Sequence, residues 1–199
     1  MSDYVEAVAR PLRGPRRLRA DMLAELADGF DEAVAEGVTS GLDRTEAAGR
    51  AAEAFGPARA VAAEFQRELE AAQARRTAWT LLAVLPAMTI LWDLFGGEGE
   101  TGLAVTLLAR VIDTATAAAF VTAALVIAGR VGSRAASLCG ASGLASIGAA
   151  LAGSVAIMLI ADPAGTPAAL PFLAAASAAG SAWVAASSLR ALRAARAAA

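Results

Sequence analysis

Hydrophobic and polar positions follow two different patterns along this chain, and the change lies near Arg76. Before that point, apolar residues recur every three or four positions among many charged ones, which is typical of amphipathic helices. After it come four long apolar stretches that hold almost no charge. Stretches of about 20 apolar residues are long enough to cross a membrane as helices. The pattern predicts an all-α protein, with a small four-helix module in residues 1–76 followed by a four-helix transmembrane bundle.

The first two helices of the module are predicted from their ends and their apolar faces. Ser2 is expected to cap the first helix, because its side chain can accept an unpaired N–H at a helix start. Gly14 and Pro15 end that helix, and the second is predicted over residues 15–36, before Gly37. Its apolar line consists of Leu18, Met22, Leu26, Phe30 and Val34. This spacing places the line on one face, which we expect to form the core.

The third and fourth helices are also marked by their ends. Asp43 followed by Glu46 matches a capped helix start. Gly56 can take the left-handed conformation that often ends a helix, and Pro57 can begin the next one. Nothing interrupts the helical pattern from there to Thr77. The fourth helix is therefore predicted to continue as a single rod into the first apolar stretch.

The apolar stretches predict membrane spans at about residues 77–95, 103–129, 136–160 and 168–189, followed by a tail at 191–199. Arginines flank the start of the first span, the end of the second, the start of the third and the end of the fourth. In the other two loops the only charged residues are acidic. Because cytoplasmic loops carry the excess of basic residues, we expect a multi-pass plasma-membrane protein with both termini in the cytoplasm.

One charged pair, Arg110 and Asp113, falls in or beside the second span, and its three-residue spacing allows the side chains to pair. If the span begins at Leu103, the pair is intramembrane and could face the bundle interior as an ion or proton site. If the span begins at Val111, Arg110 reaches the outer headgroups and neutralises Asp113. The second interpretation is favoured, because residues 111–129 are still long enough to cross.

The third span carries small residues at steps of four, a spacing that allows membrane helices to approach closely. They are Ala141, Ala145, Ala149 and Gly153, with a second pair at Gly148 and Ala152. In a chain this rich in alanine we expect packing within the bundle, and the spacing leaves homo-oligomers open.

The amino-acid composition limits the catalytic reactions, metal sites and disulfides that this chain can form. The chain has no His, so imidazole catalysis and histidine metal sites are excluded, and its single Cys139 cannot form an intramolecular disulfide. No paired carboxylates and no nucleophile with a base partner are recognisable, so we expect no enzyme activity, no metal and no cofactor. Residues 1–76 hold 14 acidic residues and 11 arginines, which argues against direct binding of nucleic acid.

The order of several elements in the first seventy residues resembles the HAAS signalling domain and the closely similar permease prefix domains. These elements are Tyr4, Leu12, Arg16, Arg17 and the runs at 24–28, 41–43 and 53–57. The resemblance implies a cytoplasmic helical module, commonly paired with a PadR-type transcriptional regulator and often followed by a short array of spans. The chain departs from the family at Gly29, where His is frequent.

The leading hypothesis is a membrane-anchored signalling or regulatory protein whose helical module binds a cytosolic partner, with membrane lipid around the spans. A small transporter or permease-associated subunit is the alternative, and Arg110 and Asp113 are its only candidate charges near the midplane. The partner-binding candidates are Arg16, Arg19, Leu23 and Asp28 on the second helix. Leu23 lies about 100° from Met22, and so at the edge of the apolar line.

Overall fold

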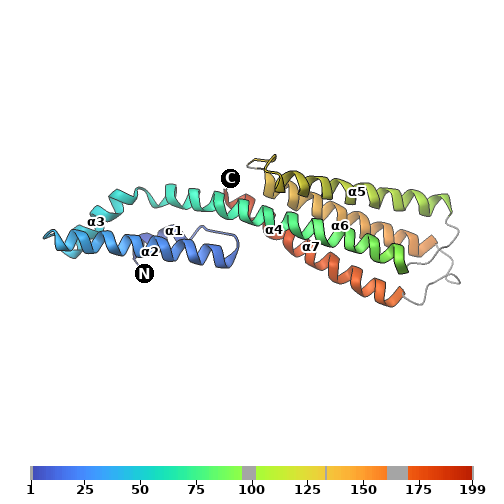
Figure 1. Cartoon of the computed structure of the whole chain (residues 1–199), viewed down its shortest axis with the longest axis horizontal. Helices are drawn as coiled ribbons and strands as arrows, with labels where there is room; N and C mark the ends of the chain where they lie inside the picture. The colour runs from blue at the N-terminus through green and yellow to red at the C-terminus, as the bar shows by residue number, and fades with distance from the viewer. Residues whose placement is uncertain (1, 96–101, 133, 161–169, 199) are drawn as a thin grey trace. The chain divides into compact units, whose positions relative to one another are not determined.

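The computed structural model describes residues 2–95, 102–132, 134–160 and 170–198 (Figure 1). The described residues form helices and no strands, so the predicted all-α class is confirmed. The helices are α1 (Asp3–Ala9), α2 (Arg16–Thr39), α3 (Arg44–Phe55), α4 (Ala58–Phe95), α5 (Leu103–Ile127), α6 (Ala135–Ile160) and α7 (Leu170–Ala198). The chain divides into two compact units. We call them the head unit (Met1–Gln73 with Arg193–Ala199) and the bundle unit (Ala74–Leu192).

Three predicted helix ends are confirmed. The Ser2 side chain accepts a hydrogen bond from the Val5 N–H at the start of α1. The Asp43 carboxylate accepts from two backbone N–H groups in the first turn of α3. Gly56 ends α3 with a φ of 83°, a conformation that costs glycine little because it has no Cβ.

The predicted end of the second helix is wrong, since α2 continues through Gly37 to Thr39. Gly37 lies where α3 comes closest. A Cβ added there would be 2.8 Å from the Cβ of Ala47. This glycine therefore permits helix packing and does not terminate α2, a use that depends on a residue ten positions further along the chain.

The core of the head unit is built around an aromatic cluster on α1, α2 and α3. The Phe30 ring stacks on Tyr4 with 5.1 Å between centroids and lies 5.9 Å from Phe55. Four of the five residues of the predicted apolar line are buried, and Leu18 packs partly buried against them. Val5 and Val8 of α1 are also fully buried. The predicted core face of α2 is therefore confirmed.

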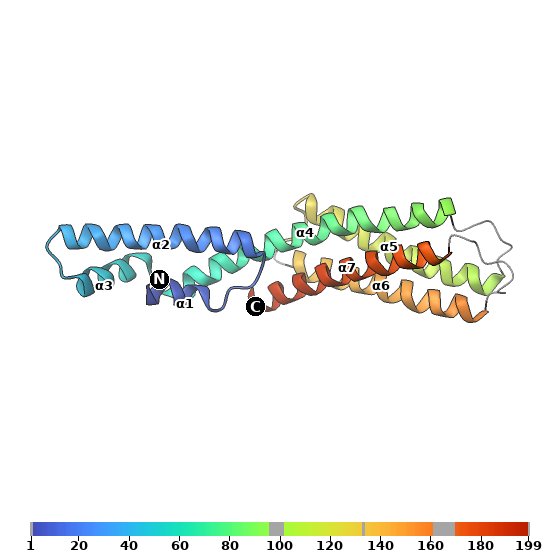
Figure 2. The same ribbon diagram turned by 90° about the horizontal axis from the view of Figure 1, so that it is seen from below.

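The fourth predicted helix is indeed a single rod. α4 runs unbroken for 38 residues and contains Pro86 within its length. At about 1.5 Å per residue it is about 57 Å long, well beyond a membrane core of about 30 Å. α4 and α7 each contribute residues to both units, and Figure 2 shows their ribbons from a second direction.

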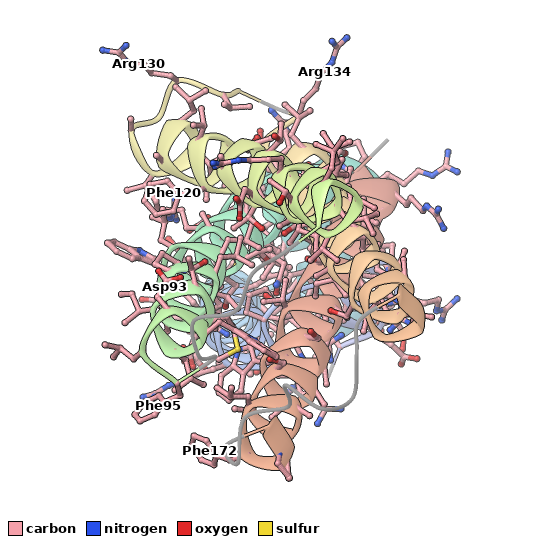
Figure 3. All side chains as sticks on the ribbon, turned by 90° about the vertical axis from the view of Figure 1, so that its right-hand side faces the viewer. Asp93, Phe95, Phe120, Arg130, Arg134 and Phe172 are labelled. Carbon is pink, nitrogen blue, oxygen red and sulfur yellow. The ribbon has the colours of Figure 1, made fainter. Side chains whose placement is uncertain are left out.

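α4, α5, α6 and α7 are long and apolar enough to cross a membrane. In the bundle unit many large apolar side chains face outward, as Figure 3 shows for Phe95, Phe120 and Phe172. Trp79 is 60% exposed and Trp183 is 66% exposed. So much outward apolar surface is typical of a protein surrounded by lipid.

Glycines permit close helix contacts in the bundle unit. A Cβ at Gly140 or Gly143 of α6 would collide with atoms of Ser188 on α7. A Cβ at Gly153 would meet Ile112 of α5 at 2.6 Å. Gly153 is thus the one residue of the predicted small-residue line that packs in this way.

The rest of that line does not behave as expected. Ala141 and Ala145 are exposed, and a Cβ at Gly148 would meet open space. Gly140 and Gly143 lie on a different face of α6 from this line, and α7 approaches that face. The expectation of packing within the bundle is therefore wrong for Ala141, Ala145 and Gly148.

Candidate functional site

The four predicted partner-binding residues do not form one patch on α2. Arg16 and Asp28 are exposed, but twelve residues separate them, which is about 18 Å along a helix and about 120° around it. Leu23 is partly buried and packs against the head core. Arg19 is also partly buried. Only Arg16 and Asp28 therefore have side chains fully available to a partner.

Arg19 has an internal role that its position on a charged face did not indicate. Its guanidinium Nη1 donates to the backbone carbonyl of Leu12, at 3.2 Å. Leu12 is fully buried in the head core. Arg19 therefore ties the first turn of α2 to the connection between α1 and α2, which we call the α1–α2 loop (residues 10–15).

A buried polar side chain of the head unit, Gln66, makes three hydrogen bonds and was not among the predicted sites. It lies on α4 and is 3% exposed. Its Oε1 accepts from the Arg13 N–H at 2.8 Å, and its Nε2 donates to the Arg13 carbonyl at 3.0 Å. The same Nε2 donates to the Ala194 carbonyl at 3.1 Å. One amide thus holds the α1–α2 loop and the end of α7 together.

A second contact presses the same loop onto α4. Gly14 has a φ of 156°, and a Cβ added there would lie 2.8 Å from the Cβ of Leu69. Leu69 is fully buried, so it has little room to move. Four features therefore hold the loop, namely the Gln66 amide, the Gly14 contact, the burial of Leu12 and the Arg19 guanidinium.

Burial raises the pKa values of two ionisable side chains of the head unit. The Tyr4 hydroxyl donates to the Gly56 carbonyl at 2.9 Å, and burial raises the pKa of this phenol. Glu70 on α4 is 8% exposed, and burial raises the pKa of its carboxyl group. In both cases the charged form loses hydration in the folded protein.

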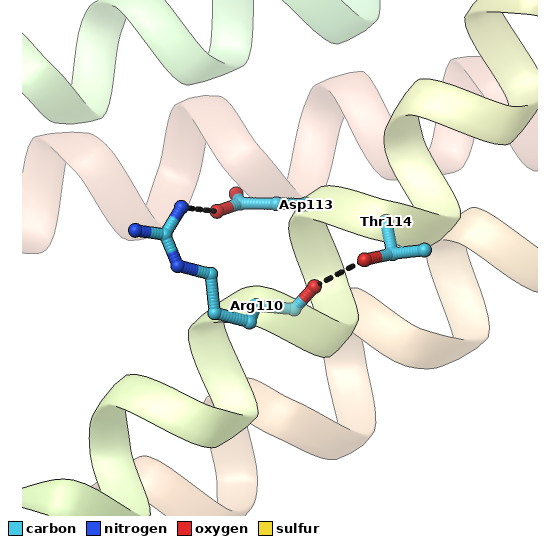
Figure 4. A network of polar contacts seen from close by, with 3 residues as sticks. All are labelled: Arg110, Asp113 and Thr114. Atoms are coloured by element: carbon cyan, nitrogen blue, oxygen red, sulfur yellow. Dashed lines mark hydrogen bonds and ion pairs between the residues drawn. The ribbon is translucent and has the colours of Figure 1, made fainter.

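Arg110 and Asp113 lie on the outer surface of α5, where Arg110 Nη1 is 3.8 Å from Asp113 Oδ2 (Figure 4). Their side chains are 78% and 60% exposed, so they do not point into the bundle interior. The Thr114 hydroxyl donates to the Arg110 carbonyl at 2.7 Å. Seven residues of α5 precede Arg110, about 10 Å of helix, so a 25-residue α5 is long enough to leave the pair near a membrane surface.

Neutral hydroxyls supply the polar contacts between bundle helices. Thr77 Oγ1 of α4 lies 3.2 Å from the Ser187 carbonyl and 3.0 Å from the Ser187 hydroxyl on α7. Thr116 of α5 lies 3.3 Å from Ser146 of α6. Within the described part of the bundle unit, no acidic residue or arginine is buried. A charged transport site of the expected kind is therefore not formed by these residues.

The described residues contain no cluster of three or more side chains suited to holding a metal ion. Comparisons with protein families, curated proteins and solved structures find no match to this chain. Any functional assignment therefore rests on the residues and contacts described above.

Proposed function

We propose that this chain is a membrane-anchored regulatory protein whose head unit lies in the cytoplasm and binds a cytosolic protein. The observation that carries the proposal is α4, a single 38-residue helix that begins in a polar, charged module and continues into an apolar span. Such a helix belongs to both units, so the polar module is followed by an apolar span within the same helix. The resemblance of the head to HAAS domains favours a PadR-type transcriptional regulator as the partner.

The cytoplasmic placement of the head is supported by the arginines of the bundle unit. Arg75, Arg76, Arg130, Arg134 and Arg190 are exposed, and none forms an ion pair among the described residues. They lie at one end of the bundle, because the Thr77–Ser187 contact and the approach of Gly140 to Ser188 bring their helix ends together. Figure 3 shows Arg130 and Arg134 extending away from the helices. An excess of arginine favours the cytoplasmic side.

Thiol labelling of intact cells tests this orientation. In a Cys139→Ala background, Gly102→Cys is expected to react with an impermeant reagent added outside, and Arg130→Cys is expected to react only after the cells are opened. Both positions are exposed on the protein, so only the membrane can make one thiol reachable and the other unreachable from outside. Labelling of Arg130→Cys in intact cells would contradict the proposed orientation.

Partner binding is tested by co-purifying the tagged full chain with a PadR-type regulator from the same genome. Asp28→Arg and Arg16→Glu are expected to reduce recovery of the regulator, since both residues are exposed on α2. Arg59→Glu is the matched control, because Arg59 is also exposed but lies on α4. Equal recovery with all three variants would place the partner surface elsewhere, on α3 or α4, and no recovery with the unaltered chain would contradict the choice of partner.

A further inference from the structure

We infer that Gln66 couples the end of α7 to the α1–α2 loop, so that the position of α7 controls the surface presented at the start of α2. The inference extends the proposed function by naming a route of regulation, and its biological meaning rests on that function. The coupling itself depends only on contacts within the head unit.

The chemistry of the Gln66 side chain suits this role. A glutamine amide has one carbonyl and two N–H donors, and the three contacts of Gln66 use both its acceptor and its donor ends. At 3% exposure, Gln66 has little water to replace a lost partner. Movement of the Ala194 carbonyl therefore leaves a buried donor unpaired unless the amide turns, and turning breaks the bonds to Arg13. The two attachments depend on each other for this reason.

Displacement of the α1–α2 loop would in turn affect the start of α2. The Arg13 backbone is held by Gln66 on both its N–H and its carbonyl. The neighbouring Leu12 carbonyl accepts from the Arg19 guanidinium. Arg19 lies within one turn of Arg16 on α2, so displacement of the loop moves or frees one arginine beside another. The affected surface includes two of the predicted partner-binding residues.

α7 provides the other side of the coupling. It is one continuous helix over Leu170–Ala198, with residues up to Leu192 in the bundle unit and residues from Arg193 in the head unit. Ala194 is 1% exposed, so its backbone is packed as well as hydrogen-bonded. A helix transmits axial movement along its length, and a hydrogen bond tolerates only a few tenths of an ångström of added distance. Small shifts of α7 are thus sufficient to release the amide.

The test is a double-mutant cycle read by amide hydrogen exchange on the full chain in lipid nanodiscs. One variant is Gln66→Leu, which keeps the volume and removes the hydrogen bonds. The other deletes residues 194–199 and so removes the acceptor carbonyl. The deletion is expected to speed exchange of the α1–α2 loop by about three- to tenfold, the equivalent of one lost neutral hydrogen bond. Gln66→Leu removes that bond and both bonds to Arg13, so its effect is expected to be at least as large. Combined, the two changes are expected to do little more than Gln66→Leu alone.

Deletion of residues 197–199 is the matched control, because it shortens α7 but retains Ala194, and it is expected to leave loop exchange unchanged. Additive effects in the double variant, or no effect of deleting 194–199 on the loop, would overturn the coupling. If Gln66→Leu unfolds the head, exchange around Phe30 will rise as well. In that case the deletion of residues 194–199 alone tests the coupling, since it leaves residues 1–73 unchanged.

The exchange experiment needs no partner, so the inference and the proposed function can fail separately. Coupling without capture of a PadR-type regulator would contradict only the choice of partner. Capture of the regulator without coupling would contradict only the role assigned to Gln66.

Discussion

Replacement of Phe30 by alanine is expected to destabilise the head unit severely. Phe30 is 3% exposed and contacts both Tyr4 and Phe55, with ring centroids 5.1 and 5.9 Å away. Removing a buried phenylalanine side chain costs about 3–5 kcal/mol, because the ring contacts are lost and a cavity remains. A unit of this size has a total stability of about 4–12 kcal/mol. The change therefore removes a large share of it, and a loss of about 4 kcal/mol raises the unfolded population about a thousandfold.

Pulsed trypsin digestion of the full chain in increasing urea measures this loss, because the arginines of the head are cut rapidly only when it unfolds. The full chain is used because residues from Arg193 belong to the head unit. Val38→Ala is the control on the same helix, since Val38 is 44% exposed and its truncation should change stability by less than about 0.5 kcal/mol. A Phe30→Ala midpoint equal to that of Val38→Ala would refute the assignment of the aromatic cluster as the core.

Three further predictions can be checked with the same preparation. Gly14→Ala is expected to destabilise the head by about 1–3 kcal/mol, because the new Cβ would press on a buried leucine of α4; Gly49→Ala, which meets open space within α3, should be neutral or stabilising in the same digestion. Glu70→Gln is expected to stabilise the head at neutral pH, because burial raises the folded-state pKa of Glu70 and so penalises its charged form. The advantage should shrink as the pH falls through that raised pKa, and equal urea midpoints at pH 7 would contradict it. Changing both Arg110 and Asp113 to alanine is expected to leave membrane insertion and urea midpoints nearly unchanged, since an exposed pair contributes about 0–1 kcal/mol; loss of the protein from membranes would show a larger role.

Local patterns predicted the parts of the fold that depend on neighbouring residues. The i+4 apolar line of α2 identified its buried face because a helix repeats every 3.6 residues. Ser2, Asp43 and Gly56 marked helix ends because capping uses groups within three or four positions. The continuity of α4 followed from the absence of a helix terminator between its polar and apolar parts.

Features that depend on distant residues were not predictable in this way. The local sequence predicts a helix end at Gly37, and only the packing of Gly37 against α3 explains why it lies inside a helix. The role of Gln66 depends on hydrogen-bond partners that lie 53 and 128 residues away. One local signal did exist. Gln66 lies four residues after Ala62 and three before Leu69, both buried, and a polar residue among such positions indicates a buried hydrogen bond.

The bond between Gln66 and Ala194 also sets the order in which the head can be completed during synthesis. Ala194 follows Gln66 by 128 residues, and α5, α6 and most of α7 lie between them. A ribosome adding about 5–20 residues per second needs about 6–26 s to make that stretch. Until then the aromatic core and the two Arg13 bonds can form from residues already made, but the Ala194 acceptor for the Gln66 amide does not yet exist. The head precedes the spans in the chain but is completed only after most of α7 has been made, and a chain stalled before Ala194 would display an incomplete head.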